Sequence, residues 1–219
     1  MTEPGPRTLA VRGGLARSGF HETAEALYLT SGYTYATAAE AEAAFADELD
    51  RFVYSRFGNP TVRMFEERMR LLEGAEAGFG TATGMAAVFV SLAALLGSGD
   101  RVVASRELFG SCYVVLDEIL PRWGVRTEFV PASDLAAWEQ ALSRPTQAVY
   151  FESPSNPMQE LVDVRTVSAL AHEAGATVVV DNVFATPVLA RPLELGADVV
   201  VYSATKHIDG QGRALGGIV

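Results

Sequence analysis

The chain has 219 residues, 49% of them hydrophobic, and a formal net charge of −10. This length and apolar content suit one large domain, or one domain with an arm, and exclude a disordered chain. The negative charge gives no long-range attraction to nucleic acid or an anionic membrane. The longest apolar run, residues 85–96, is too short to span a bilayer, and the first residues lack the apolar core of a signal peptide. Cys112 is the only cysteine, so we expect a cytoplasmic protein without an intrachain disulfide.

Residues 1–59 differ from the rest of the chain, because they contain no long apolar run. They predict an N-terminal arm, with an amphipathic helix over residues 38–50 and an extended remainder. A regular pattern begins where Asn59 can cap a helix that starts at Pro60 and ends before Gly74. We therefore expect an arm over residues 1–59 and one large domain over residues 60–219.

Short apolar segments and helical patterns then alternate along the chain. The expected strands are residues 77–80, 101–105, 126–130, 148–152, 177–181 and 199–203, and the expected helices are residues 85–96, 111–120, 135–142 and 164–174. This alternation predicts an α/β fold with a mainly parallel sheet covered on both faces, which binds ligands at the carboxyl ends of its strands. The last apolar run, residues 216–219, resembles an interrupted strand. It predicts a sheet that is incomplete at its C-terminal end, and a sequence that is part of a longer chain.

Lysine is rare in this sequence: of the 17 basic residues, only Lys206 is not arginine. An arginine stays protonated, whereas a lysine amine in an apolar site can be neutral and form an imine. A lysine that persists against this bias indicates a chemical role, and a chance surface lysine is the alternative interpretation.

Polar groups follow two of the expected strands. Asp181 ends a run of four β-branched residues, and Lys206 comes just after the hydroxyls of Ser203 and Thr205. Pyridoxal phosphate (PLP) needs an acid beside its pyridine nitrogen and a lysine that forms an imine. One strand–crossover–strand step separates Asp181 from Lys206, so adjacent parallel strands would place both at the same sheet edge. A turn-forming Asp and an ordinary polar strand end are the alternatives.

Three glycines in residues 78–84 join a short expected strand to a helix. Backbone amides at such a helix start suit a phosphate. Because the spacing is one residue off the dinucleotide fingerprint, a Rossmann-type NAD-binding domain is a second hypothesis. Two observations disfavour it: the next strand ends at Ser105 rather than an acid, and NAD binding would leave Asp181 and Lys206 without a role.

Five motifs occur together in one order. They are Tyr54-Ser-Arg-Phe-Gly-Asn-Pro-Thr61, Thr83-Gly-Met-Ala-Ala87, Glu152-Ser-Pro-Ser-Asn-Pro157, Asp181-Asn-Val-Phe-Ala-Thr-Pro187 and Ser203-Ala-Thr-Lys206. From Tyr54 onward, the chain resembles the PLP-dependent enzymes of cysteine and methionine metabolism, the cystathionine γ-synthase-like family. The resemblance implies the N-terminal portion of a fold type I, aspartate-aminotransferase-like enzyme, with the C-terminal small domain absent.

The resemblance also implies roles for individual residues. Lys206 would hold PLP as a Schiff base and shuttle protons, and Asp181 would pair with the pyridine nitrogen. Phe109 would stack on the ring, where the family more often has tyrosine; a core position is the alternative for this residue. Other cofactor-binding residues implied are Gly84, Met85, Ser203 and Thr205 around the phosphate, Asn156 and Thr186 near the cofactor, and Tyr54 and Arg56 reaching the phosphate of a neighbouring subunit. The implied assembly is a homotetramer built from dimers with shared active sites.

One segment refines the expected function. Residues 205–213 are more similar to O-succinylhomoserine sulfhydrylases than to cystathionine γ-synthases. The chain departs from the family pattern at Val183, where many members have threonine. This similarity implies γ-replacement in methionine biosynthesis, with O-succinylhomoserine and sulfide giving homocysteine. A cystathionine γ-synthase or a γ-lyase is the nearest alternative, and an NAD-binding domain or an inactive fragment is a distant one. The three histidines lack metal-ligand spacing, so no metal site is expected.

Overall fold

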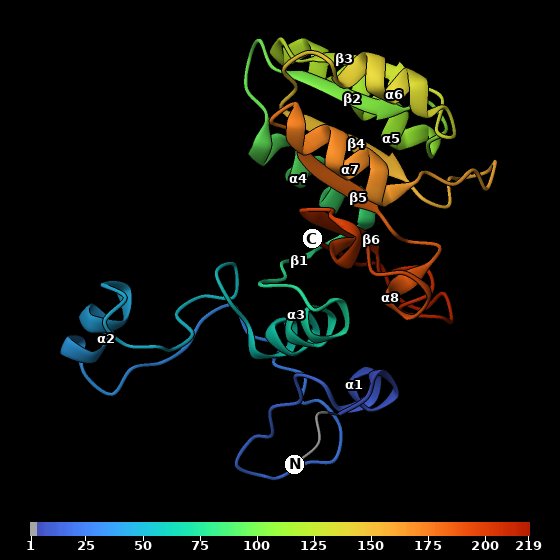
Figure 1. Cartoon of the computed structure of the whole chain (residues 1–219). Helices are drawn as coiled ribbons and strands as arrows, with labels where there is room; N and C mark the ends of the chain where they lie inside the picture. Colours follow the sequence, from blue (N-terminus) through green and yellow to red (C-terminus); the bar gives the residue numbers. More distant parts are fainter. Residues whose placement is uncertain (1–3) are drawn as a thin grey trace. The chain divides into compact units, whose positions relative to one another are not determined.

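The computed structural model describes residues 4–219. The chain forms two compact units, and the boundary between them lies between Gly78 and Phe79 (Figure 1). Among the described residues, no helix combines the length and the apolar character needed to cross a membrane.

The second unit is built on a seven-stranded sheet with the order β1-β7-β6-β5-β4-β2-β3. Its strands are β1 (Gly80–Thr81), β2 (Arg101–Ser105), β3 (Arg126–Val130), β4 (Ala148–Glu152), β5 (Thr177–Asp181), β6 (Val199–Ser203) and β7 (Gly217–Ile218). Strands β2 to β6 run parallel, whereas β7 is antiparallel to both β1 and β6. The predicted α/β class and mainly parallel sheet are confirmed.

The bounds of β2 to β6 are those predicted. The interiors of β2, β4, β5 and β6 are buried, as their apolar runs indicate, whereas the edge strand β3 is buried only at Val130. All five residues of β4 are buried. The prediction for residues 77–80 was wrong, since β1 begins only at Gly80. The expected interrupted strand is β7, and it is paired on both sides, so the sheet edges are β1 and β3.

Helices cover both faces of this sheet. They are α4 (Gly84–Leu95), α5 (Gly110–Val114), α6 (Leu135–Leu142) and α7 (Val164–Glu173), and the short helix α8 (Thr186–Leu189) follows β5. One core cluster joins Leu92 of α4 and Leu116 to Tyr150 and Val179 of the sheet. On the other face, Trp138 of α6 meets Phe151 of β4 edge to face, with ring centroids 6.0 Å apart.

The helix expected over residues 111–120 is divided. It consists of α5, a π-helical turn over Val115–Ile119 and a 3-10 turn over Leu120–Trp123. Pro121 has no N–H for an α-helical bond, and the 3-10 turn ends at Gly124 with φ 83°. The second half of the predicted helix is therefore π-helical rather than α-helical, and the 3-10 turn extends the helical segment to Trp123.

The first unit contains α1 (Pro6–Arg12), α2 (Ala38–Phe45) and α3 (Pro60–Glu73). Helix α3 begins and ends as predicted: the Asn59 side chain accepts a hydrogen bond from the Thr61 amide at 2.9 Å, and Gly74 has φ 71°. Helix α2 is shorter than expected, and the chain turns at Asp47 with φ 62°. Helix α1 was not predicted, although Pro6 is a common first helical residue.

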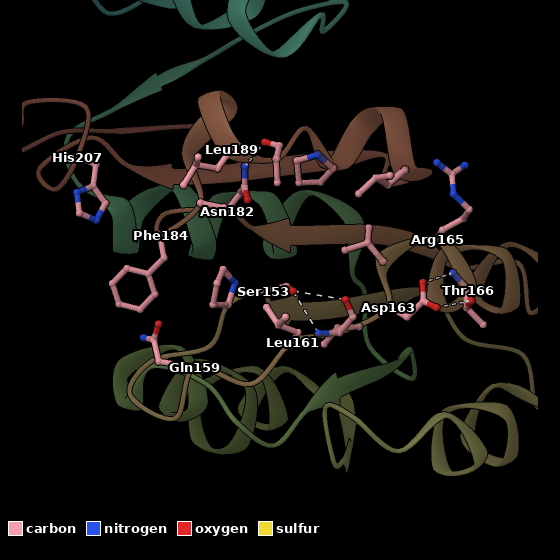
Figure 2. Close-up of a pocket in the computed structure, with 17 residues that line it drawn as sticks. Ser153, Gln159, Leu161, Asp163, Arg165, Thr166, Asn182, Phe184, Leu189 and His207 are labelled. Atoms are coloured by element: carbon pink, nitrogen blue, oxygen red, sulfur yellow. Dashed lines mark hydrogen bonds between the residues drawn. The ribbon is translucent and has the colours of Figure 1, made fainter.

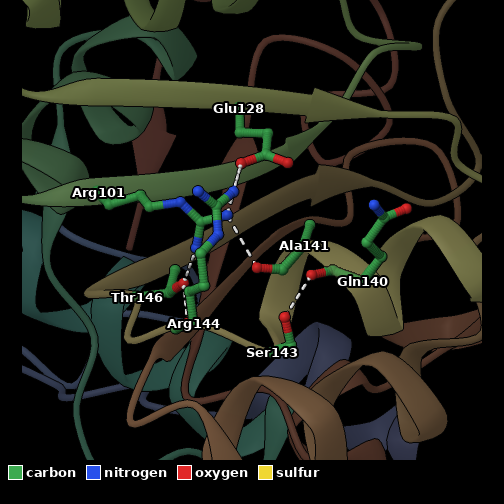
Figure 3. A network of polar contacts seen from close by, with 7 residues as sticks. All are labelled: Arg101, Glu128, Gln140, Ala141, Ser143, Arg144 and Thr146. Atoms are coloured by element: carbon green, nitrogen blue, oxygen red, sulfur yellow. Dashed lines mark hydrogen bonds and ion pairs between the residues drawn. The ribbon is translucent and has the colours of Figure 1, made fainter.

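A polar network stabilises the second unit near the amino ends of its strands (Figure 3). Arg101, the first residue of β2, donates hydrogen bonds to Glu128 Oε2 at 2.6 Å and to the Ala141 carbonyl at 2.8 Å. Arg144 donates to the same Glu128 oxygen at 2.5 Å. The network ties β2, β3 and the end of α6 together, and it lies at the opposite end of the strands from Asp181.

Candidate active site

The carboxyl ends of β5 and β6 lie side by side, as predicted. The strands pair in parallel, with Asp181 opposite Val201. Strand β6 ends at Ser203, and a turn follows in which the Lys206 amide donates to the Ser203 carbonyl at 3.2 Å. Lys206 is exposed rather than enclosed in an apolar site, and its ammonium group has no ion pair among residues 4–219. Its amine is therefore accessible and not neutralised by a carboxylate.

The start of helix α4 touches the end of β6. A Cβ atom on Gly84 would lie 2.4 Å from Ser203 Cβ, a clash that only glycine avoids. Thr83 caps the helix by accepting a hydrogen bond from the Ala86 amide at 3.0 Å. The first amides of a helix have no partner inside it and favour an anion. Gly84, Met85 and Ser203 thus form the kind of cradle that a phosphate fits.

Thr205 has a partner within the chain. Its hydroxyl oxygen accepts a hydrogen bond from the Gly216 amide at 3.1 Å and lies 3.3 Å from the Gly216 carbonyl. The hydroxyl therefore ties the turn after β6 to the segment that leads into β7.

Asp181 is a buried carboxylate, with 8% of its surface exposed. Its Oδ1 accepts a hydrogen bond from the Val183 amide at 3.0 Å. Burial, and then the nearby charge of Glu152, raises the pKa of Asp181 to about 7. A cationic group beside Asp181 would oppose both effects, so this position suits a protonated pyridine nitrogen.

Glu152 is a site residue that sequence reasoning missed. It ends β4 directly opposite Asp181 in the register of β5. Its Oε1 accepts a hydrogen bond from the Phe109 amide at 2.8 Å, and its Oε2 accepts one from the Asn156 amide at 3.1 Å. The available signal was an acid at the end of an otherwise apolar strand, directly before the Ser-Pro-Ser-Asn-Pro run.

Cys112 lies beside these two acids. One ligand atom from each of Cys112, Glu152 and Asp181 falls within 4.8 Å of the others. Burial raises the pKa of the Cys112 thiol, and it also raises the pKa of Glu152. The three groups therefore form a buried cluster of ionisable side chains at the ends of β4 and β5.

Three further predicted residues border the same region of the second unit. Phe109 is 44% exposed, so the alternative that it is a core residue is wrong. Asn156 is half-buried in the turn after β4. Thr186 follows β5 with φ 58°, a left-handed conformation that strains a β-branched residue, and its amide donates to the Asn182 carbonyl at 2.9 Å.

Tyr54 and Arg56 belong to the first unit. The Arg56 guanidinium lies over the Tyr54 ring at 4.8 Å and over the Phe57 ring at 5.0 Å. Both Tyr54 and Arg56 are exposed. They form a compact cation–π pair at the surface of that unit.

A cavity of about 860 Å³ lies in the second unit (Figure 2). Its lining is mainly apolar and includes Leu161, Phe184 and Leu189, with Asn182 and His207 among its polar members. Asn182 is held in place, because its Nδ2 donates to the Ala190 carbonyl at 2.9 Å and to the Tyr202 hydroxyl at 2.7 Å. Asp181 and Lys206 are not part of this lining.

This arrangement places a buried acid, a helix start suited to a phosphate and an accessible lysine at the carboxyl ends of β5 and β6, as PLP-dependent enzymes require. The chain belongs to the family of Cys/Met metabolism PLP-dependent enzymes, whose profile matches residues 7–219. PLP is the cofactor of this family, and the NAD-binding hypothesis is not supported.

Particular relatives are close in sequence. The chain is 70% identical over 212 residues to O-succinylhomoserine sulfhydrylase of Mycobacterium tuberculosis, covering 97% of this chain and 52% of that protein. It is 44% identical over 193 residues to L-methionine gamma-lyase of Pseudomonas putida, covering 88% of this chain and 48% of that protein. The chain thus spans about half the length of the curated relatives it matches.

A solved structure supports the fold. A protein of Campylobacter jejuni, assigned as an O-acetylhomoserine (thiol)-lyase, superimposes with a TM-score of 0.92 at 31% identity. The match covers 99% of this chain and 54% of that one. That crystal structure contains a pyridoxyl-lysine phosphate residue. The predicted fold type is therefore confirmed.

Proposed function

We propose that this chain supplies the PLP-binding part of an enzyme that replaces the γ-substituent of an activated homoserine ester. The reaction is O-succinylhomoserine plus hydrogen sulfide giving homocysteine plus succinate, a step of methionine biosynthesis. One observation carries the proposal. Asp181, the contact between Gly84 and Ser203, and the turn that contains Lys206 all lie at the carboxyl ends of β5 and β6. The choice of substrate is supported by the 70% identical relative.

The phosphate of the cofactor would bind at the start of α4. The amides of Gly84 and Met85 and the hydroxyl of Ser203 are the donors there, and the Thr205 hydroxyl would join them by leaving the Gly216 carbonyl to which it donates at 3.3 Å. The close contact between Gly84 and Ser203 brings the helix start against the strand end, so both can face one anion.

Asp181 would hold a proton on the pyridine nitrogen. When bound, PLP supplies an electron sink that stabilises negative charge on substrate carbons. Asp181 is suited to that partner, because its buried carboxylate has an elevated pKa that a neighbouring cation would lower. The Val183 amide fixes the orientation of the carboxylate through Oδ1.

Lys206 would attach the cofactor covalently and then move protons at Cα and Cβ of the substrate. Its place on an exposed turn, stabilised by the hydrogen bond from the Gly210 amide to the Lys206 carbonyl at 2.8 Å, leaves the amine accessible. The exposed ring of Phe109 would stack on the cofactor. Asn156 and Thr186 would lie near the cofactor, with Asn156 also close to the substrate carboxylate.

The N-terminal arm, residues 1–59, would cross to a neighbouring subunit, where Tyr54 and Arg56 reach the phosphate. Exposed apolar side chains on the arm support this: Phe20, Leu27, Leu29 and Phe57 face solvent in the chain alone. Apolar surface of this kind is typical of a protein–protein interface. The large domain would begin at residue 60, and the cytoplasmic assembly would be a homotetramer of dimers with shared sites.

A γ-lyase is the second candidate, favoured by the 44% identity to a methionine gamma-lyase. Such an enzyme would use the same residues, but no external thiol would add at Cγ. A cystathionine γ-synthase would instead accept cysteine as the nucleophile.

The test is a substrate comparison on the protein that contains this chain. We expect the highest kcat/KM with O-succinylhomoserine and sulfide, measured as homocysteine and succinate formed in equal amounts. Preference for O-acetylhomoserine would change the ester, and preference for cysteine would indicate a cystathionine γ-synthase. Faster formation of 2-oxobutyrate than of homocysteine in the presence of sulfide would establish the γ-lyase.

A further inference from the structure

Glu152 connects two loops that are far apart in the sequence. One carboxylate oxygen accepts the Phe109 amide at 2.8 Å and the other accepts the Asn156 amide at 3.1 Å. We propose that Glu152 is a positioning residue that fixes Phe109 and Asn156 on either side of the cofactor site. This inference rests on the proposed function, because those two residues are site residues only if PLP binds there.

The local structure explains why this contact matters at Phe109. Phe109 is the N-cap residue of α5, and no side chain caps that helix. The Glu152 carboxylate, 43 residues away in the sequence, is what holds the Phe109 amide. Since the Phe109 ring is exposed, little apolar packing restrains it, and its orientation depends on its backbone.

The anchor itself is rigid. Glu152 ends a fully buried strand and is 3% exposed, so its side chain has little freedom. A carboxylate accepts hydrogen bonds at both oxygens, which a position facing two N–H donors requires. Glutamine would keep one acceptor and place a donor against the second amide, and aspartate is one methylene shorter.

The carboxylate also faces the groups around Asp181. Cys112 of α5, Tyr150 of β4 and Asp181 of β5 are the titratable side chains that surround it. Glu152 is the largest charged contributor to the raised pKa of Asp181, after burial. Its removal would therefore change both the two loop positions and the electrostatics of Asp181.

The experiment compares Glu152→Gln with Glu160→Gln, the same change at an exposed residue in the following loop. Hydrogen exchange by mass spectrometry on the cofactor-free protein follows peptides that contain Phe109 and Asn156. The affinity for PLP and the induced circular dichroism of bound PLP are measured in parallel. We expect Glu152→Gln to speed exchange in both peptides and to weaken PLP binding, each by about 10-fold, with a smaller dichroic band per bound cofactor. Glu160→Gln should change none of these.

Glu152→Asp tests the same idea if the glutamine variant does not fold. It keeps the charge but cannot reach both amides, so exchange should rise in at least one of the two peptides while α7 stays protected. Unchanged exchange in both peptides, in whichever variant folds, would overturn the inference. If the wild-type protein does not bind PLP at all, the proposed function fails, and the exchange data still decide whether Glu152 anchors the two loops.

Discussion

The two units of this chain bury their apolar side chains to very different extents. In the second unit, Phe151 and Leu116 are fully buried between sheet and helices. In the first unit, Phe20 and Leu29 are each 93% exposed. Burial of apolar surface is the main favourable contribution to folding, so the second unit has a core of its own. The first unit gains less from such burial, because its large apolar side chains are more exposed.

Polar contacts also hold the first unit together. The Asn59 side chain donates to the Tyr28 carbonyl at 2.9 Å, and Arg68 donates to the Gly13 carbonyl at 2.8 Å. Such bonds orient a segment but contribute only about 1 kcal/mol each. The difference teaches that the second unit forms an apolar core of its own, whereas the first unit leaves more of its large apolar side chains exposed.

The largest expected effect lies in the second unit, at Lys206. Lys206→Ala should reduce turnover by at least about 10³-fold, because the amine that would hold the cofactor and move protons is lost. Borohydride reduction of the wild-type protein, followed by peptide mapping, should place the cofactor on Lys206. Arg7→Lys offers a control, since it introduces a new, exposed lysine in the first unit that should remain unmodified. A reduced, yellow protein with unmodified Lys206 would contradict the assignment.

Asp181→Asn should lower kcat by about 10²-fold to 10³-fold, because the pyridine nitrogen loses the anion that keeps it protonated. The same change should stabilise the cofactor-free protein at pH 8. The folded-state pKa of Asp181, about 7, is above its ordinary value of 3.8, so its contribution to stability falls as the pH rises between those values.

Denaturation of the cofactor-free protein at pH 5 and pH 8 checks this sign. The wild-type free energy of unfolding should decrease across that interval more than that of Asp181→Asn. The exposed Asp117→Asn serves as the control. Equal pH dependence in wild type and Asp181→Asn would show that Asp181 is not the buried proton acceptor of the second unit.

Arg56 tests whether the first unit acts in a neighbouring subunit. Arg56→Ala should weaken PLP binding by roughly 10-fold to 100-fold, since a charged hydrogen bond to phosphate is lost. Hybrids of Arg56→Ala and Lys206→Ala subunits should regain activity, because one of their sites combines two intact halves. Confirmed hybrids without any recovered activity would mean that the arm serves its own subunit.

The smallest expected effect concerns the polar organisation of the first unit. Asn59→Ala should lower the free energy of unfolding by about 1 kcal/mol, because α3 loses its cap. Asn59→Asp keeps the cap but loses the donor to the Tyr28 carbonyl, so it separates the two roles. Hydrogen exchange near Tyr28 should increase in both variants. Unchanged exchange there would show that Asn59 only caps the helix.

The sequence by itself determined the parts whose signals are local. The bounds of β2, β4, β5 and β6 followed from short apolar runs, and the limits of α3 followed from Asn59, Pro60 and Gly74. The single lysine and the five ordered motifs indicated the cofactor and the family, because chemistry and motif order need no three-dimensional information.

Only the tertiary structure decided which distant groups meet. The pairing of Glu152 with Asp181, the contact of Gly84 with Ser203 and the insertion of β7 between β1 and β6 each join segments well separated in the sequence. Local periodicity carries no information on such partners, since the same strand pattern fits several sheet orders. The role of Glu152 depends on two backbone amides, and backbone amides are present at almost every residue. Glu152 therefore binds the amides of Phe109 and Asn156 because the fold brings them to its carboxylate, and no motif specifies this pairing.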